Sequence, residues 1–198
     1  MNPLMIAEHL FLVTVTLVFA LIFGLPLGIC AYLNPKSRRY ILWFSELMQT
    51  IPALALLGVI MVVAGAGKTT VIIGLTLYAL LPVVHNTYLG LSEVSLPIKE
   101  VAVGMGMTAF YRLFHVELPI AFPVIFTGIR MATITSVGAA AFATFVGGGG
   151  LGSVIYQGIR TQNIKMILGG TLSLMFMAVI IDGAMGFVEN RLHRHRIS

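Results

Sequence analysis

The sequence predicts an all-α integral membrane protein with about five or six transmembrane helices. Hydrophobic residues make up 58% of the 198-residue chain and charged residues only 10%, whereas soluble domains carry about 25% charged residues. The apolar residues gather in five long runs, each close to the roughly 20 residues that a helix needs to cross a bilayer. Little chain is left between the runs, so a soluble domain of ordinary size is excluded.

The apolar runs are expected to be helices because lipid offers the backbone no hydrogen-bond partner. Their continuous pattern, rather than an alternating one, argues against a β-barrel. The first run contains Gly24, Pro26 and Gly28, which predicts a kink or a close helix contact rather than a helix end. The expected spans form a transmembrane domain over residues 8–190 and cover approximately residues 9–33, 41–64, 70–91, 121–146 and 166–187.

The basic residues predict the orientation of the chain. They lie at the ends of the apolar runs, as topology determinants do, so the net charge of +5 does not indicate a nucleic-acid partner. One side of the membrane would hold Lys68, Arg160 and Lys165. The other would hold Lys36, Arg38, Arg39, Lys99, Arg112, Arg191, Arg194 and Arg196. By the positive-inside rule the richer side is cytoplasmic, which predicts a multi-pass membrane protein with an external N-terminus and a basic cytoplasmic tail at 191–198.

A cytoplasmic loop over residues 92–120, between the third and fourth spans, is too apolar for a solvated linker. Ser95 is an N-cap candidate and Pro97 suits a first helical turn. We expect a short helix, a bend around Gly104 and Gly106, and a second amphipathic piece that ends at Pro119. An apolar helix outside the membrane is typical of a docking element.

The same loop carries a motif. Glu100, Ala102 and Gly106 are followed by the run Val116-Glu117-Leu118-Pro119. This pattern resembles the EAA loop of type I ABC importer permeases, which have a MetI-like transmembrane domain. The spacings match throughout, and the two departures, Val101 for Ala and Val116 for Ile, are mild.

Other stretches are similar to permeases that import glycine betaine, carnitine, choline or related osmoprotectants. One departure is His85, where that subfamily is expected to have Arg before Asn-Thr. The stretches are 49–56, 77–82, 86–88, 106–108 and 145–152, and the resemblance covers about residues 8–190.

The resemblance implies a location in the bacterial cell membrane and a division of labour among subunits. A second permease subunit, identical or a paralogue, would complete the path, and a separate external binding protein would deliver the solute. A partner ATP-binding subunit would bind ATP and Mg²⁺, so no cofactor is expected on this chain and it is not expected to be an enzyme. The residues that would couple this chain to the ATPase are Glu100, which orients the helix, Gly106, which permits the turn, and Ala102, Val116, Leu118 and Pro119.

Candidate residues for the translocation path or gate are mostly polar groups within or beside the spans: Glu46, Gln49, Thr50, Pro52, Asn86, Thr87, Tyr88, Gly147, Gly149 and Gly150. Charges within the membrane are functional candidates because each costs on the order of 3 kcal/mol to insert. Structural roles stay open: Glu46 and Asp182 are as well explained by an interhelical partner such as Arg130, and the glycines by a plain turn. The aromatic residues Trp43, Tyr78 and Tyr88 suit either a cage for a quaternary amine or the membrane interface.

Several local patterns are weaker. Gly65 to Thr70 resembles the end of a phosphate-binding loop, but Val62 stands where the first glycine is required. The residues 193–196 alternate His and Arg, which makes a poor metal site. Three alternatives remain: a permease for another small solute such as an amino acid or methionine, an ATP-independent transporter or channel, and a membrane scaffold.

Overall fold

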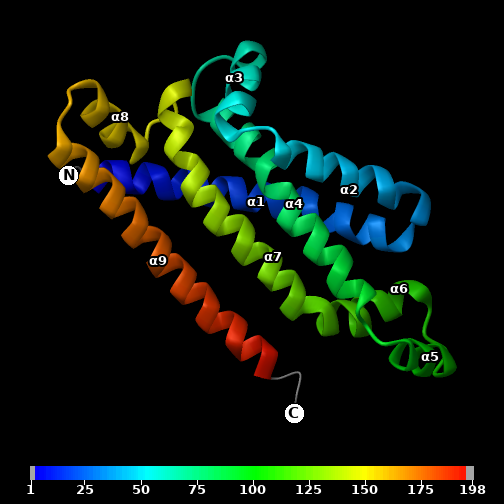
Figure 1. Ribbon diagram of the computed structural model, residues 1–198. Coiled ribbons are helices and arrows are strands. Elements are labelled where there is room, and N and C mark those ends of the chain that lie inside the picture. The colour runs from blue at the N-terminus through cyan, green and yellow to red at the C-terminus, as the bar shows by residue number, and fades with distance from the viewer. Residues whose placement is uncertain (1–2, 195–198) are drawn as a thin grey trace.

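The computed structural model describes residues 3–194, and every regular element in that range is helical. Four helices are long and apolar enough to cross a membrane, or five if one bent pair counts as a single span. This confirms the predicted all-α membrane fold. The long helices are α1 (Pro3–Leu33), α4 (Lys68–Ser92), α7 (Leu118–Ala139) and α9 (Ile164–Arg194). In Figure 1, α4, α7 and α9 run side by side and α1 crosses them obliquely.

The predicted contact at the glycines of α1 is confirmed. This helix continues through Pro26 without ending. A methyl group on Gly28 would lie 2.5 Å from Cβ of Thr87, and one on Gly24 would lie 2.7 Å from Cγ1 of Val83. Both glycines therefore let α1 lie directly against α4, as small residues do at helix crossings in membranes.

The run predicted as the span 41–64 differs from expectation, because it forms two helices. α2 (Pro35–Thr50) and α3 (Ala53–Ala64) meet at an angle of 100°. Ile51 and Pro52 between them are extended, with ψ angles of 127° and 131°. Proline disfavours helical torsions in the residue before it and lacks an N–H for the helix ladder, so the break falls at this point.

The loop 92–120 also differs in one respect. α5 (Leu96–Gly104) is followed by a turn at Gly106 and then by α6 (Ala109–Arg112), as the sequence predicts. However, the second piece does not end at Pro119. A π-helical turn, η1 (Leu113–Glu117), joins α6 to α7 without interruption, and Pro119 follows this turn as the second residue of α7.

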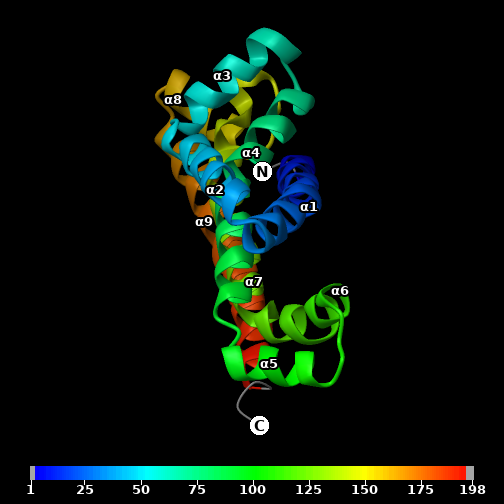
Figure 2. The same ribbon diagram turned by 90° about the vertical axis from the view of Figure 1, so that its right-hand side faces the viewer.

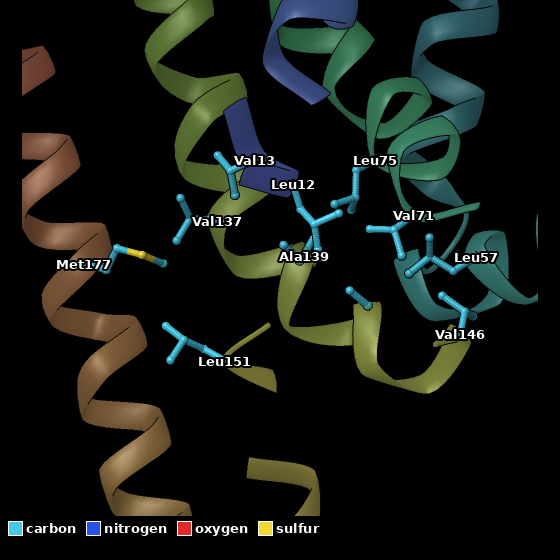
Figure 3. Packing of buried hydrophobic residues seen from close by; sticks show 12 residues of the cluster. Leu12, Val13, Leu57, Val71, Leu75, Val137, Ala139, Val146, Leu151 and Met177 are labelled. Carbon is cyan, nitrogen blue, oxygen red and sulfur yellow. The ribbon is translucent and has the colours of Figure 1, made fainter. Parts of the chain in front are cut away.

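The two ends of the molecule are built differently (Figure 2). α5 and α6 lie across one end, and the opposite end holds α3 and α8 (Gly152–Arg160), which follows the 3₁₀ turn η2 (Ala140–Val146). The largest buried cluster lies at the α3–α8 end, where α1, α3, α4, α7 and η2 meet, and Met177 of α9 reaches it (Figure 3). Apart from such contacts, α9 exposes most of its apolar side chains, which suits lipid or a partner helix.

Candidate functional site

A groove lined by both polar and apolar side chains opens between α2, α4 and α7. Its volume is about 250 Å³, and Glu46 is the only carboxylate among the residues that line it. Glu46 and Gln49 are three residues apart and therefore share one face of α2. The lining residues are Glu46, Gln49, Leu81, Pro82, His85, Asn86, Met131 and Thr135.

Backbone carbonyl groups hold two of the other polar side chains of the groove. Asn86 donates from Nδ2 to the carbonyl oxygen of Pro82 at 2.9 Å, and Thr135 donates to the carbonyl oxygen of Met131 at 2.8 Å. α7 approaches closely here, because a methyl group on Gly128 would lie 2.5 Å from Cβ of Asn86. The groove thus combines one carboxylate with fixed, mostly neutral polar groups, an arrangement that attracts a cation more than an anion.

The groove unites three of the predicted path residues, Glu46, Gln49 and Asn86, and adds His85. Two further lining residues, Met131 and Thr135 on α7, were not predicted. Nothing in the sequence distinguishes them from other residues of the apolar run, because their place in the groove depends on how α7 packs against α4.

Other predicted path residues lie elsewhere. Thr87 is buried beside Gly28 and donates to the carbonyl oxygen of Val83 at 2.7 Å. Tyr88 packs against Arg38, whose guanidinium carbon lies 4.9 Å from the ring centroid. Thr50 and Pro52 are exposed at the α2–α3 bend.

The aromatic residues do not gather around the groove. Trp43 is exposed on α2, Tyr78 packs against the largest buried cluster, and Tyr88 is occupied by Arg38. None of the three is among the residues that line the groove. An aromatic cage is therefore not formed by these side chains.

α5 presents an apolar surface at its end of the molecule. Val101 and Met105 are 63% and 71% exposed, and Phe110 on α6 is 74% exposed. A hollow of about 320 Å³ lies beside Val101 and Met105, and its lining residues are Pro97, Ile98, Val101, Ala102, Met105, Met107 and Val116. Contiguous apolar surface of this kind marks a site of interaction with another protein or with a membrane.

The motif residues of the loop divide by exposure. Glu100 is exposed and Ala102 is buried, so α5 turns one face outward and one inward. Gly106 has φ of +81°, a torsion that glycine adopts without strain, and the turn it forms reverses the chain between α5 and α6. Val116 is half-buried at the hollow, Leu118 packs on a buried cluster around Leu91, and Pro119 is exposed.

The glycine run 147–150 forms a tight turn at the opposite end. Gly147, Gly149 and Gly150 all have positive φ. The N–H of Gly150 faces the Glu8 carboxylate at 3.4 Å, and Glu8 also pairs with Lys68 at 3.0 Å. A carboxylate already faces this turn, which argues against the phosphate-cradle interpretation.

The segment from Gly65 to Thr70 likewise has its backbone groups engaged. The N–H of Gly67 donates to the carbonyl oxygen of Val146 at 2.7 Å, and the Thr70 hydroxyl donates to the carbonyl oxygen of Gly65. No grouping of three His, Cys, Asp or Glu side chains suited to a metal occurs within residues 3–194. Residues 195–198 of the predicted basic tail lie outside the described residues.

Arg130 on α7 joins two carboxylates of α9. Its guanidinium lies 2.6 Å from Asp182 and 2.6 Å from Glu189, which also accepts a hydrogen bond from Thr127. The suggested pairing of Arg130 with Asp182 is therefore present, whereas Glu189 was not foreseen. These contacts hold the peripheral helix α9 to the rest of the bundle. They give Arg130 and Asp182 a structural role.

Comparison with known proteins matches residues 10–194 to the family described as binding-protein-dependent transport system inner membrane component. The glycine betaine/carnitine/choline transport system permease protein OpuCD of Bacillus subtilis (strain 168) is 42% identical over 93% of this chain and 81% of its own. The carnitine transport permease protein OpuCD of Listeria monocytogenes serotype 1/2a (strain 10403S) is 38% identical over 94% and 84%. A chain of the MetNI methionine ABC transporter, in an inward-facing conformation, superposes with a TM-score of 0.84 at 26% identity over 93% of both chains.

Proposed function

From the premise that this chain belongs to the family of binding-protein-dependent transport system inner membrane components, we propose that it forms the translocation path for a quaternary-ammonium osmoprotectant such as glycine betaine, carnitine or choline. The observation that carries the substrate class is the similarity over nearly the whole chain to permeases named for these solutes. The groove supports it, because Glu46 supplies one negative charge where a cationic group would pass.

We propose that the rest of the transporter is supplied by partner subunits. A second permease subunit faces the groove, a binding protein delivers the solute on the outside, and an ATP-binding subunit holds ATP and Mg²⁺. α5 is then the coupling helix, and its exposed apolar surface is the contact with the ATPase. This chain itself carries out no covalent chemistry, needs no cofactor and contacts lipid rather than nucleic acid.

In this arrangement the α5 end is cytoplasmic, together with the C-terminus, and the N-terminus is external. Alternating access requires that ATP binding favour one of two packed arrangements of the bundle. The groove lies between α2, α4 and α7, so a relative movement of these helices changes its width. The polar residues on its walls then need only a weak affinity for the solute, because the binding protein selects it.

The test is uptake into proteoliposomes that contain the whole complex with ATP inside. We expect uptake of labelled glycine betaine, carnitine or choline that depends on ATP and on the binding protein, and no uptake of methionine. Uptake of methionine instead, or uptake without ATP, would overturn the proposal in favour of another solute or a secondary transporter.

One variant tests the groove within that assay. Glu46→Gln should lower uptake of the cationic solute about tenfold, the factor produced by losing roughly 1.4 kcal/mol of attraction. Glu93→Gln, at an exposed carboxylate after α4, is the matched control and should transport like the wild type. Equal uptake by the two variants would remove Glu46 from the path.

A further inference from the structure

A buried carboxylate lies beside the α5 end, outside the groove. Glu117, the last residue of the π-helical turn η1, is only 1% exposed. The apolar residues Leu113 and Leu118 beside it belong to the cluster around Leu91. An ionised carboxylate in such surroundings is tolerated only when it is paired and hydrogen-bonded.

Two side chains from different elements supply the pairing. Arg112 of α6 donates from Nε to Oε1 of Glu117 at 2.5 Å, and remains 24% exposed itself. Tyr32, in the last turn of α1, packs against the same cluster, and its hydroxyl lies close enough to the Glu117 carboxylate to interact with it. Glu117 thereby joins the end of α1 to the junction of α6 and α7.

Lys99 extends this cluster into α5. Its ammonium lies 5.1 Å from the centroid of the Tyr32 ring, a cation–π contact, and donates to the carbonyl oxygen of Leu91 in α4 at 3.2 Å. Ala102 is the only residue of α5 that is buried. Lys99 is therefore a specific polar link from α5 to both α1 and α4.

We propose that Lys99, Tyr32, Arg112 and Glu117 form a relay that carries movement of α5 to α1, α4 and α7. The inference rests on the proposed function, in which α5 moves with the ATPase. A helix that pulls on Lys99 changes the position of the Tyr32 ring and with it the interaction of the Tyr32 hydroxyl with the Glu117 carboxylate. The π-helical turn that ends at Glu117 gives α7 a place to adjust, since such turns occur as single-turn irregularities within α-helices and are frequent at functional sites.

The relay makes the two links Lys99–Tyr32 and Tyr32–Glu117 consecutive, so breaking either should have the same consequence. Tyr32→Phe keeps the ring for Lys99 but removes the hydroxyl. Lys99→Gln removes the charge from the ring and leaves the hydroxyl in place. Both are positioning residues, so the decisive readout is solute transported per ATP hydrolysed, which a merely structural role would not change in properly assembled complexes.

The experiment uses the whole complex in proteoliposomes, with glycine betaine, carnitine and choline as probes. Each single variant should lower the solute transported per ATP about fivefold, within the range of coupling energies between sites. ATPase copurification and the melting temperature should match the wild type. The double variant should be no worse than the more affected single variant, and Lys99→Arg, which keeps a cation over the ring, should restore coupling.

The controls are Tyr40→Phe and Lys36→Gln, both at exposed positions of α2, which should transport like the wild type. A wild-type ratio in both single variants would overturn the relay. So would losses that multiply in the double variant, or a loss explained entirely by fewer assembled complexes. If the wild-type complex itself shows no ATP-dependent uptake, the proposed function fails, and the relay fails with it.

Discussion

The two ends of the molecule each contain a glutamate in an ion pair, yet the surroundings of the pairs differ. At the α3–α8 end, Glu8 and Lys68 are 32% and 47% exposed, and the close packing there comes from glycines that let backbone segments touch. At the α5 end, Glu117 is nearly inaccessible and is the common partner of two other elements. Exposure to water therefore determines how much each ion pair matters for stability: the exposed pair at the α3–α8 end contributes little, whereas loss of one partner of the buried pair at the α5 end is strongly destabilising.

The largest effect is expected from Glu117→Ala. This substitution leaves Arg112 without its partner and opens a cavity, and we expect a loss of about 3 kcal/mol in the free energy of unfolding. Thermal unfolding of the purified permease complex in detergent measures it. A loss no greater than that of Glu93→Ala, at an exposed carboxylate, would show that burial is not what matters at this end.

Gly152→Ala should have the next largest effect, at the opposite end. A methyl group on this first residue of α8 would lie 1.9 Å from the carbonyl oxygen of Ala141. Because that neighbour is backbone, α8 or η2 must shift, at a cost of about 1–3 kcal/mol. The same unfolding assay applies. Gly58→Ala, in the middle of α3 where the methyl group meets nothing within 4 Å, is the control and should be neutral or slightly stabilising.

The smallest effect is expected from Lys68→Gln. Breaking an exposed pair costs no more than about 1 kcal/mol, and salt screens it further. The melting temperature should therefore change little at low ionic strength and not at all in 0.5 M salt. A loss comparable to that of Glu117→Ala would contradict the contrast between the two ends.

Much of the fold follows from the sequence because lipid restricts the backbone to few solutions. The runs that became α4 and α9 have no competing interpretation. Pro26 and Pro52 show where prediction from the sequence fails. Pro26 and Pro52 both lie in long apolar runs, but the first is accommodated within α1, which packs on α4, and the second ends α2. The difference depends on contacts with distant residues, which a local pattern does not contain.

The same limit applies to the groove. Asn86, Thr87 and Tyr88 are consecutive, so the sequence suggested them together. Successive residues of a helix point about 100° apart, and only Asn86 faces the groove. Thr135 was missed because its role depends on the crossing of α7 with α4. The motif around Glu100 did identify the exposed surface of α5, but the carboxylate of Glu117 acquires its partners only when Tyr32, far away in the chain, is brought beside it.

The bend between α2 and α3 has a mechanical consequence for the groove. Glu46 and Gln49 lie in the last turns of α2, just before Ile51 and Pro52, whereas Leu57 anchors α3 in the largest buried cluster. If α2 tilts while α3 stays fixed, the rotation must be absorbed by the backbone torsions of those two linking residues. Proline fixes its own φ near −65°, so few free torsions remain. Any tilt of α2 against α3 therefore bends the chain at Ile51 and Pro52, little more than one helical turn from the Glu46 carboxylate.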